Sequence, residues 1–181
     1  IGSAKESLQH FEKAIKIKPD YTDAFYSLGA AHQDLGNKLQ ALENFKKTIK
    51  IKPDYAEVYN NLGLLFEDLS RFEDSLSYYN KAINLKPNDE KTYNNLGNLL
   101  NHLGKYDEAT KAFYKALKIK PNYPKAYSNL LFNLNYKIDF DPNEYLKEAK
   151  NFRLNCKTIK KEMSFKYQYE KNPKKLKIGL V

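Results

Sequence analysis

The apolar residues of the chain recur at helical intervals, in segments that alternate with short turns. In residues 22–35 the apolar positions follow one face of a helix: Phe25, Leu28, Ala31 and Leu35. A second segment runs from about residue 38 to residue 52, and its apolar set is Ala41, Leu42, Phe45, Ile49 and Ile51. Gly36 separates the two segments, and Pro53 ends the second because proline cannot continue a helix. The pattern predicts a pair of amphipathic helices.

This pair of segments recurs every 34 residues. The unit ends on IKIKPDY, IKIKPDY, INLKPND and LKIKPNY, which close at residues 21, 55, 89 and 123. The same interval relates Pro19, Pro53, Pro87 and Pro121, then Phe11, Phe45, Tyr79 and Phe113, and then Leu28, Leu62, Leu96 and Leu130. Agreement in residue type at several independent columns indicates a tandem repeat. We therefore predict an all-α fold.

Small residues recur at two further columns. They are Gly29, Gly63 and Gly97 on the first helix, and Ala41, Ser75 and Ala109 on the second. A glycine inside a helix costs roughly 1 kcal/mol relative to alanine. Because three units accept this cost at the same position, we expect the backbones of the two helices to approach each other there.

The repeated unit resembles the tetratricopeptide repeat. The residues that match the family pattern are Phe25, Leu28, Gly29, Ala41, Phe45 and Pro53, with their counterparts one and two periods later. The resemblance implies a helix-pair solenoid, wound into a right-handed superhelix over residues 1–136. Its predicted units are a half repeat (1–21), three repeats (22–55, 56–89 and 90–123) and a degenerate half repeat (124–136). In the last unit Leu131 replaces the expected glycine, as terminal repeats are often atypical.

A stack of helix pairs leaves a concave groove that is lined mostly by the first helix of each pair. Asparagine can pair with both the N–H and the C=O of an extended peptide. Adjacent repeats are expected roughly 10 Å apart, which is about three residues of extended chain at ~3.3 Å each. A groove column of such residues therefore predicts a ladder that grips a peptide backbone and tolerates different side chains. The predicted ladder is Ser27, Asn61, Asn95 and Asn129.

The ladder alone is too weak for tight binding. A net hydrogen bond contributes about 0.5–1.5 kcal/mol, whereas micromolar affinity needs about 8 kcal/mol. Alternatively, these asparagines are ordinary solvated surface residues, because asparagine is common throughout the chain. A clamp for a C-terminal carboxylate is disfavoured, because the groove columns lack lysine and arginine. The further groove residues that we expect to add contacts are Asn60, Asn94, Asn98, Asn101 and Tyr136.

The period ends after Tyr136, and a different segment occupies residues 137–156. Asp141 can cap a helix, Pro142 suits its first turn, and Glu144 would complete a capping box. We predict a capping helix over residues 142–155, with Tyr145, Leu146, Ala149 and Phe152 as its apolar side. Residues 157–175 are rich in lysine and are interpreted as a basic linker. The final residues 176–181, LKIGLV, are typical of the first strand of a buried parallel sheet.

The order of these segments resembles the junction in O-linked N-acetylglucosamine transferases, where repeats lead into a glycosyltransferase of two Rossmann lobes. The resemblance covers residues 128–181. It implies that the groove holds acceptor proteins through an asparagine ladder, which applies to Asn61, Asn95 and Asn129, whereas Ser27 departs from it. It also implies that the sugar-nucleotide and catalytic residues lie beyond Val181. The sequence begins at Ile1, so we expect a fragment of a longer protein.

Charge separates the repeats from the tail. Residues 147–177 carry a net charge of +8 out of +9 for the chain, so the repeats are nearly neutral. This basic segment could bind nucleic acid through phosphate contacts, but we favour a solvated linker. The single cysteine, Cys156, excludes an internal disulfide and favours a reducing, cytoplasmic compartment. No apolar run reaches the ~20 residues that a membrane helix needs.

The repeats favour a protein–protein interaction scaffold that holds extended polypeptide, and the resemblance implies that it is the substrate-recruiting domain of a protein O-glycosyltransferase. The alternative is a tetratricopeptide adaptor without linked catalysis. The coding sequence after Val181 separates the two. Catalysis by this chain is not expected, because no nucleophile–base pair or phosphate loop is present. We expect no cofactor and no metal, and we leave self-association, the donor sugar and the bound protein open.

Overall fold

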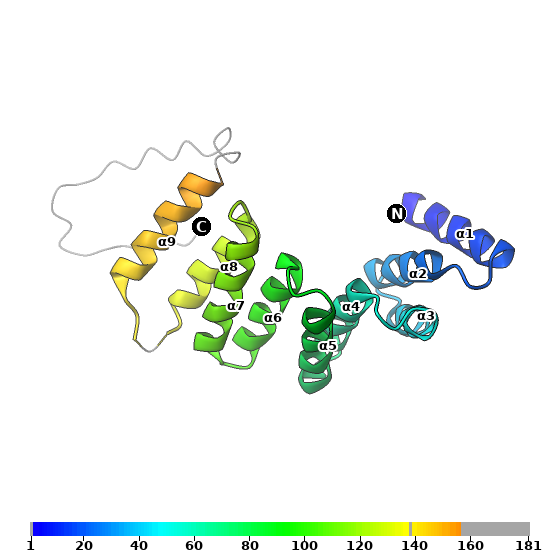
Figure 1. Cartoon of the computed structure of the whole chain (residues 1–181), viewed down its shortest axis with the longest axis horizontal. Helices are drawn as coiled ribbons and strands as arrows, with labels where there is room; N and C mark the ends of the chain where they lie inside the picture. The colour runs from blue at the N-terminus through cyan, green and yellow to red at the C-terminus, as the bar shows by residue number, and fades with distance from the viewer. Residues whose placement is uncertain (1, 138, 157–181) are drawn as a thin grey trace.

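The computed structural model describes residues 2–137 and 139–156, and the regular structure in this part of the chain is entirely helical (Figure 1). The predicted fold class, an all-α solenoid of helix pairs, is confirmed. The predicted linker and strand, residues 157–181, lie outside the described residues. The helices are α1 (Gly2–Ile17), α2 (Thr22–Asp34), α3 (Lys38–Ile51), α4 (Ala56–Asp68), α5 (Phe72–Leu85), α6 (Glu90–His102), α7 (Tyr106–Ile119), α8 (Pro124–Leu134) and α9 (Pro142–Asn155).

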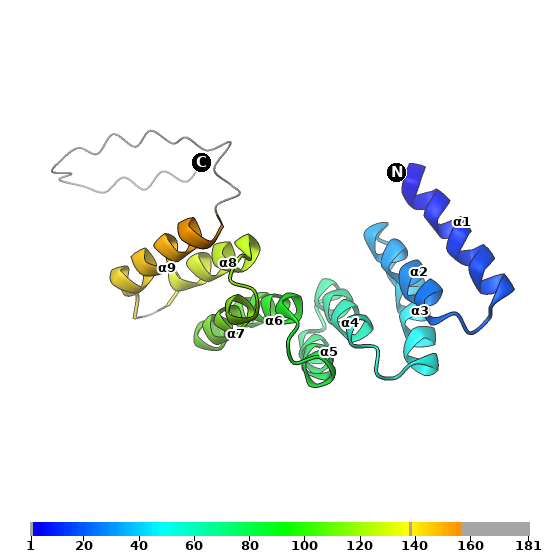
Figure 2. The same cartoon turned by 45° about the horizontal axis from the view of Figure 1, so that its top comes forward.

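The helices pack in pairs along an arc. Helix α2 packs on α3, α4 on α5, and α6 on α7, while α1 packs on α2 as the second helix of an incomplete unit. The first helices also contact one another, α2 with α4, α4 with α6, and α6 with α8. Figure 2 shows α2, α4, α6 and α8 on the inner side of the arc, with α3, α5 and α7 on the outer side. We call the side formed by α2, α4, α6 and α8 the inner face.

Each helix pair is centred on an aromatic ring that lies on a glycine. The rings of Phe45, Tyr79 and Phe113 on the second helices are completely buried. A Cβ atom added to Gly63 or to Gly97 would lie only 2.5 Å from the facing ring, and one on Gly29 would lie 2.6 Å from Phe45. The close approach predicted at these glycines is therefore confirmed, and the ring of the second helix fills the space that a side chain at each glycine would occupy. Between α4 and α5 the second helix also reaches the backbone at the glycine, because Ser75 Oγ donates a hydrogen bond to the Gly63 carbonyl at 2.8 Å.

The degenerate half repeat lacks the glycine that the full repeats have on their first helix. Leu131 lies in the glycine column of α8, half-buried. The 34-residue period ends after Tyr136, and α9 begins 36 residues after α7, so α9 is not a regular second helix of the repeat.

The turn inside a pair requires a left-handed residue. Gly36 has φ +75° and Gly104 has φ +71°, and at the equivalent place in the second full repeat Ser70 has φ 57°. Glycine adopts this conformation without the Cβ clash that other residues suffer. Gly36 and Gly104 therefore end the first helix and reverse the chain, as predicted for Gly36. None of the helices in the described ranges is long and apolar enough to cross a bilayer.

Helix α9 covers the end of the stack and has the predicted bounds. The side chain of Asp141 accepts a hydrogen bond from the backbone N–H of Asn143, with Oδ1 2.8 Å from the nitrogen. Glu144 accepts a hydrogen bond at 3.1 Å from the hydroxyl of Tyr114 on α7. Glu144 thus ties α9 to the last full repeat, and the predicted role of Glu144 in a capping box is wrong.

We expect Asp141→Ala to lower the free energy of unfolding by about 1 kcal/mol, because it removes the N-cap of α9. The measurement is urea unfolding, with hydrogen exchange of the α9 amides to localise the effect. Asp54→Ala is the matched control, since Asp54 precedes α4, a helix without a side-chain cap. Equal stability of the two variants would show that the Asp141 cap contributes nothing.

Candidate functional site

Two adjacent columns of side chains run across the inner face, one residue apart on each first helix. They hold asparagine at most positions and join neighbouring repeats. We call them the amide columns. The first column consists of Ser27, Asn61, Asn95 and Asn129, and the second consists of Tyr26, Asn60, Asn94 and Ser128.

A hydrogen bond between the amide columns crosses each step of the stack. The donor is an amide nitrogen in the first column, and the acceptor is a side-chain oxygen in the second column, 35 residues earlier. The interval is constant, so the arrangement is a property of the repeat. The bonds are Asn61 Nδ2 to the Tyr26 hydroxyl at 3.3 Å, Asn95 Nδ2 to Asn60 Oδ1 at 3.0 Å, and Asn129 Nδ2 to Asn94 Oδ1 at 2.9 Å.

These bonds leave part of each amide available. An asparagine amide has two N–H groups and one acceptor oxygen. Within the described part of the chain, the side-chain oxygens of Asn95 and Asn129 accept no hydrogen bond, whereas that of Asn61 is 3.4 Å from Nδ2 of Asn60. Asn95 and Asn129 therefore retain an acceptor and a second N–H in an orientation fixed by the neighbouring repeat.

The predicted site residues differ in how far their side chains are buried. Asn94 is completely buried and Asn95 is 9% exposed. The side chain of Asn94 has no solvent-exposed surface in this structure and orients Asn129 through the hydrogen bond between them. Two buried amide atoms on α6, Nδ2 of Asn94 and Oδ1 of Asn101, have no partner among the described residues. The half-buried members of the predicted set are Ser27, Asn60, Asn61, Asn98, Asn101 and Asn129.

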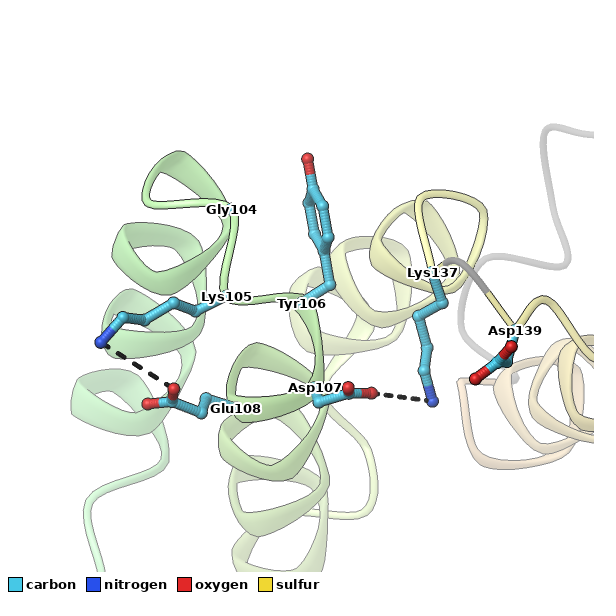
Figure 3. Close-up of a pocket in the computed structure, with 7 residues that line it drawn as sticks. All are labelled: Gly104, Lys105, Tyr106, Asp107, Glu108, Lys137 and Asp139. Carbon is cyan, nitrogen blue, oxygen red and sulfur yellow. Dashed lines mark ion pairs between the residues drawn. The ribbon is translucent and has the colours of Figure 1, made fainter.

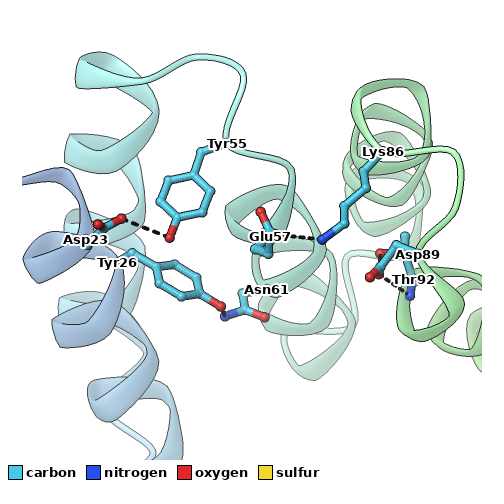
Figure 4. A network of polar contacts seen from close by, with 8 residues as sticks. All are labelled: Asp23, Tyr26, Tyr55, Glu57, Asn61, Lys86, Asp89 and Thr92. Carbon is cyan, nitrogen blue, oxygen red and sulfur yellow. Dashed lines mark hydrogen bonds and ion pairs between the residues drawn. The ribbon is translucent and has the colours of Figure 1, made fainter.

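The N-terminal end of the amide columns is built from tyrosines (Figure 4). The rings of Tyr26 and Tyr55 lie 5.1 Å apart, and the Tyr55 hydroxyl donates to Oδ1 of Asp23 at 3.1 Å. Burial, together with that carboxylate, raises the pKa of Tyr55 to about 12. Glu57 on α4 lies 2.6 Å from the ammonium of Lys86, the residue that follows α5, and this ion pair lowers the pKa of the Glu57 carboxyl. Both carboxylates near the amide of Asn61 therefore already have partners: Asp23 accepts from Tyr55, and Glu57 pairs with Lys86.

The raised pKa of Tyr55 predicts a loss of stability at high pH. An unfolded tyrosine ionises near pH 10, so the stabilisation from neutral Tyr55 is complete below about pH 10. It is then lost as the pH rises through about 12. We expect ring-labelled tyrosine NMR to show Tyr55 ionising near that pH, with later signals from more deeply buried tyrosines. In Tyr55→Phe the alkaline loss of stability should be smaller. An unchanged pH profile in Tyr55→Phe would contradict this assignment.

The sequence pattern did not predict one polar cluster, which joins two neighbouring repeats. Glu67 of α4 accepts from the Tyr79 hydroxyl at 3.1 Å and lies 2.9 Å from Nδ1 of His102. Burial raises the pKa of the Glu67 carboxyl. The equivalent residues in the neighbouring repeats are Gln33 and Asn101. Because the column does not repeat a carboxylate, the periodicity gave no signal for this contact between repeats.

The metal-ligating side chains of the described residues are dispersed. In residues 2–137 and 139–156 no three histidine, cysteine or acidic side chains are placed to hold a metal ion. Cys156 is a free, buried thiol, and burial raises its pKa. A raised pKa disfavours the thiolate, which is the reactive form. The arrangement is suited to binding through amides and aromatic rings.

Sequence comparison places the repeats in a known family. The model described as "Tetratricopeptide repeat" matches residues 56–89 and 90–123, and the model described as "TPR repeat" matches residues 1–36 and 39–70. The chain belongs to the tetratricopeptide-repeat family. As a tetratricopeptide-repeat protein it is a protein–protein interaction scaffold. None of the curated proteins matches the sequence.

Solved structures show the same fold. The crystal structure of MamA is 23% identical with a TM-score of 0.74, over 87% of this chain and 91% of that one. A Thermobaculum terrenum O-GlcNAc transferase is 26% identical with a TM-score of 0.68, over 74% of this chain but 26% of that one. YrrB, described as a TPR protein with an unusual peptide-binding site, is 20% identical with a TM-score of 0.64, over 85% and 78%. The MamA and YrrB likenesses concern the tetratricopeptide fold alone.

Proposed function

We propose that this tetratricopeptide-repeat chain holds an extended polypeptide along its inner face, with the amide columns contacting the ligand backbone. The observation that carries the proposal is the set of cross-repeat hydrogen bonds, because they orient Asn95 and Asn129 before any ligand arrives. A side chain that is already fixed loses little conformational freedom on binding.

The spacing of the repeats suits an extended strand. Neighbouring first helices pack at roughly 10 Å, and an extended chain advances about 3.3 Å per residue. Every third ligand residue would therefore meet an amide of the first column. Because backbone groups are the same in every residue, this mode accepts many sequences.

The energetics require additional contacts. Three amides at about 1 kcal/mol each supply roughly 3 kcal/mol, and micromolar affinity needs about 8 kcal/mol. The remainder would come from ligand side chains that contact the rest of the inner face. We therefore expect weak binding of a neutral peptide and stronger binding of the natural partner.

A direct binding experiment tests this function. The probe is a labelled neutral peptide of about twelve residues, with serine, alanine and threonine in repeating order, which is long enough for about four repeats. Titrated into the isotope-labelled protein, it should bind saturably and shift the side-chain amide signals of Asn61, Asn95 and Asn129. The proposal fails if no saturable binding occurs, or if the shifts are confined to the outer helices α3, α5 and α7.

We further propose that the repeats recruit acceptor proteins to a cytoplasmic protein O-glycosyltransferase. The resemblance of residues 128–181 to the junction of that family and the likeness to the T. terrenum transferase support it. A tetratricopeptide adaptor without catalysis is the alternative, and the likeness to MamA fits it equally well. The coding sequence after Val181 should encode a sugar-nucleotide-binding domain. The full-length protein should then transfer N-acetylglucosamine from its nucleotide to acceptor proteins, and a non-catalytic continuation would favour the adaptor.

A further inference from the structure

Three aromatic rings cluster at the C-terminal end of the inner face. Phe132 of α8 is 59% exposed, and Tyr136, just beyond that helix, is 52% exposed. Their ring centroids are 4.8 Å apart, and Tyr136 also stacks on Tyr106, the first residue of α7, at 6.0 Å. We call these three residues the aromatic cluster. Contiguous exposed apolar surface of this kind can serve as an interaction site.

The aromatic cluster continues the amide columns. Phe132 follows Asn129 by one helical turn, so the two side chains lie on the same side of α8. One, two and three periods earlier the place of Phe132 is taken by Asn98, Leu64 and Ala30, and that of Tyr136 by His102, Asp68 and Asp34. Exposed rings at these two places are therefore confined to the last unit among the described repeats.

Tyr106 of the aromatic cluster also lines a cavity of about 320 Å³, whose lining residues are drawn in Figure 3. Nζ of Lys137 lies 3.2 Å from Asp107, and Nζ of Lys105 lies 3.9 Å from Glu108. Asp139 has no ion-pair partner in the described part of the chain, so the cavity carries one unpaired carboxylate. Its lining consists of Gly104, Lys105, Tyr106, Asp107, Glu108, Lys137 and Asp139.

We propose that the aromatic cluster and this cavity receive an arginine side chain of the polypeptide that the amide columns hold. The inference rests on the proposed function. A guanidinium is flat and always charged, so it can stack on the exposed rings while it pairs with a carboxylate. The uncompensated charge of Asp139 attracts a cation and repels an acidic side chain. An apolar side chain would gain the ring contact but leave the carboxylate without a partner.

The test compares versions of the neutral peptide that carry arginine, lysine or alanine at one end, with each end tried in turn. For the unaltered protein, we expect arginine at one of the two ends to tighten binding about fivefold over alanine, and lysine to tighten it less. The double substitution Phe132→Ala and Tyr136→Ala should remove the preference, and Asp139→Asn should reduce it. Phe140→Ala is the matched control, because Phe140 is an exposed ring that contacts Tyr145 outside the cluster.

The outcomes separate this inference from the proposed function. If the alanine peptide binds but arginine gives no preference, or if the preference survives in the double variant, the arginine site is overturned and the amide columns stand. If an arginine preference persists while asparagine-to-alanine changes in the columns leave affinity unchanged, the site stands and the ladder fails. If neither peptide binds, both fail. Circular dichroism of each variant confirms that the fold is retained.

Discussion

Replacing Phe113 by alanine is expected to lower the free energy of unfolding by about 3–5 kcal/mol. The ring is completely buried and lies directly on Gly97, where an added Cβ would be 2.5 Å from it. Glycine has no side chain that could relax into the space left behind, so the cavity would persist. Urea unfolding followed by circular dichroism measures the loss.

Substitution of Gly97, which faces the Phe113 ring, is expected to have the opposite effect from the usual Gly→Ala change in a helix. Gly→Ala inside an exposed helix would stabilise it by about 1 kcal/mol. Gly97→Ala should instead destabilise the protein by about 1–3 kcal/mol, because the new methyl group meets the Phe113 ring. In a Phe113→Ala background the same change should be neutral or stabilising. Phe132→Ala, at an exposed ring, is the control with little expected cost. If Phe113→Ala costs less than about 1 kcal/mol, the ring–glycine contact does not hold the repeat together.

The triple substitution Asn61→Ala, Asn95→Ala and Asn129→Ala should weaken binding of the neutral peptide about a hundredfold. Each amide is expected to contribute about 1 kcal/mol, and 1.4 kcal/mol corresponds to a factor of ten. The substitutions also remove the hydrogen bonds between repeats, so a loss of stability should accompany the loss of affinity. Peptide titration followed by fluorescence anisotropy, well below the unfolding temperature, measures the first effect alone.

The matched control for this triple variant changes asparagines that are exposed away from the amide columns, Asn80, Asn84 and Asn122. This control should bind the peptide as the unaltered protein does. If the two triple variants bind equally well, the amide columns are not the contact surface, and the asparagines of the inner face are only structural.

The periodicity predicted the fold because a 34-residue interval fixes which residues occupy equivalent places. It did not reveal what fills the space at each place. The glycine column indicated a close approach, yet only the structure shows that Phe45, Tyr79 and Phe113 make it. The bounds of α9 followed from Asp141 and Pro142, which act locally. The partner of Glu144 could not be predicted, because Tyr114 lies 30 residues away.

The candidate site was predictable to the same extent. The columns of the inner face follow from helical position, and they include the residues that the structure brings together. The hydrogen bond from Asn129 to Asn94 depends on rotamers and on the crossing of α6 and α8, which a sequence column does not specify. The complete burial of Asn94 also depends on rotamers and on how the helices cross, so the sequence column does not predict it. The aromatic cluster arises in the degenerate unit, where the repeat pattern no longer constrains residue type.

The most direct test concerns whether the inner face contacts the backbone of its ligand. The measurement compares the affinity of the neutral peptide with that of its counterpart in which every backbone N–H is replaced by an ester oxygen, leaving the side chains unchanged. If Asn95 and Asn129 accept hydrogen bonds from the ligand backbone, the ester version should bind at least about tenfold more weakly. Equal affinity of the two would contradict the account.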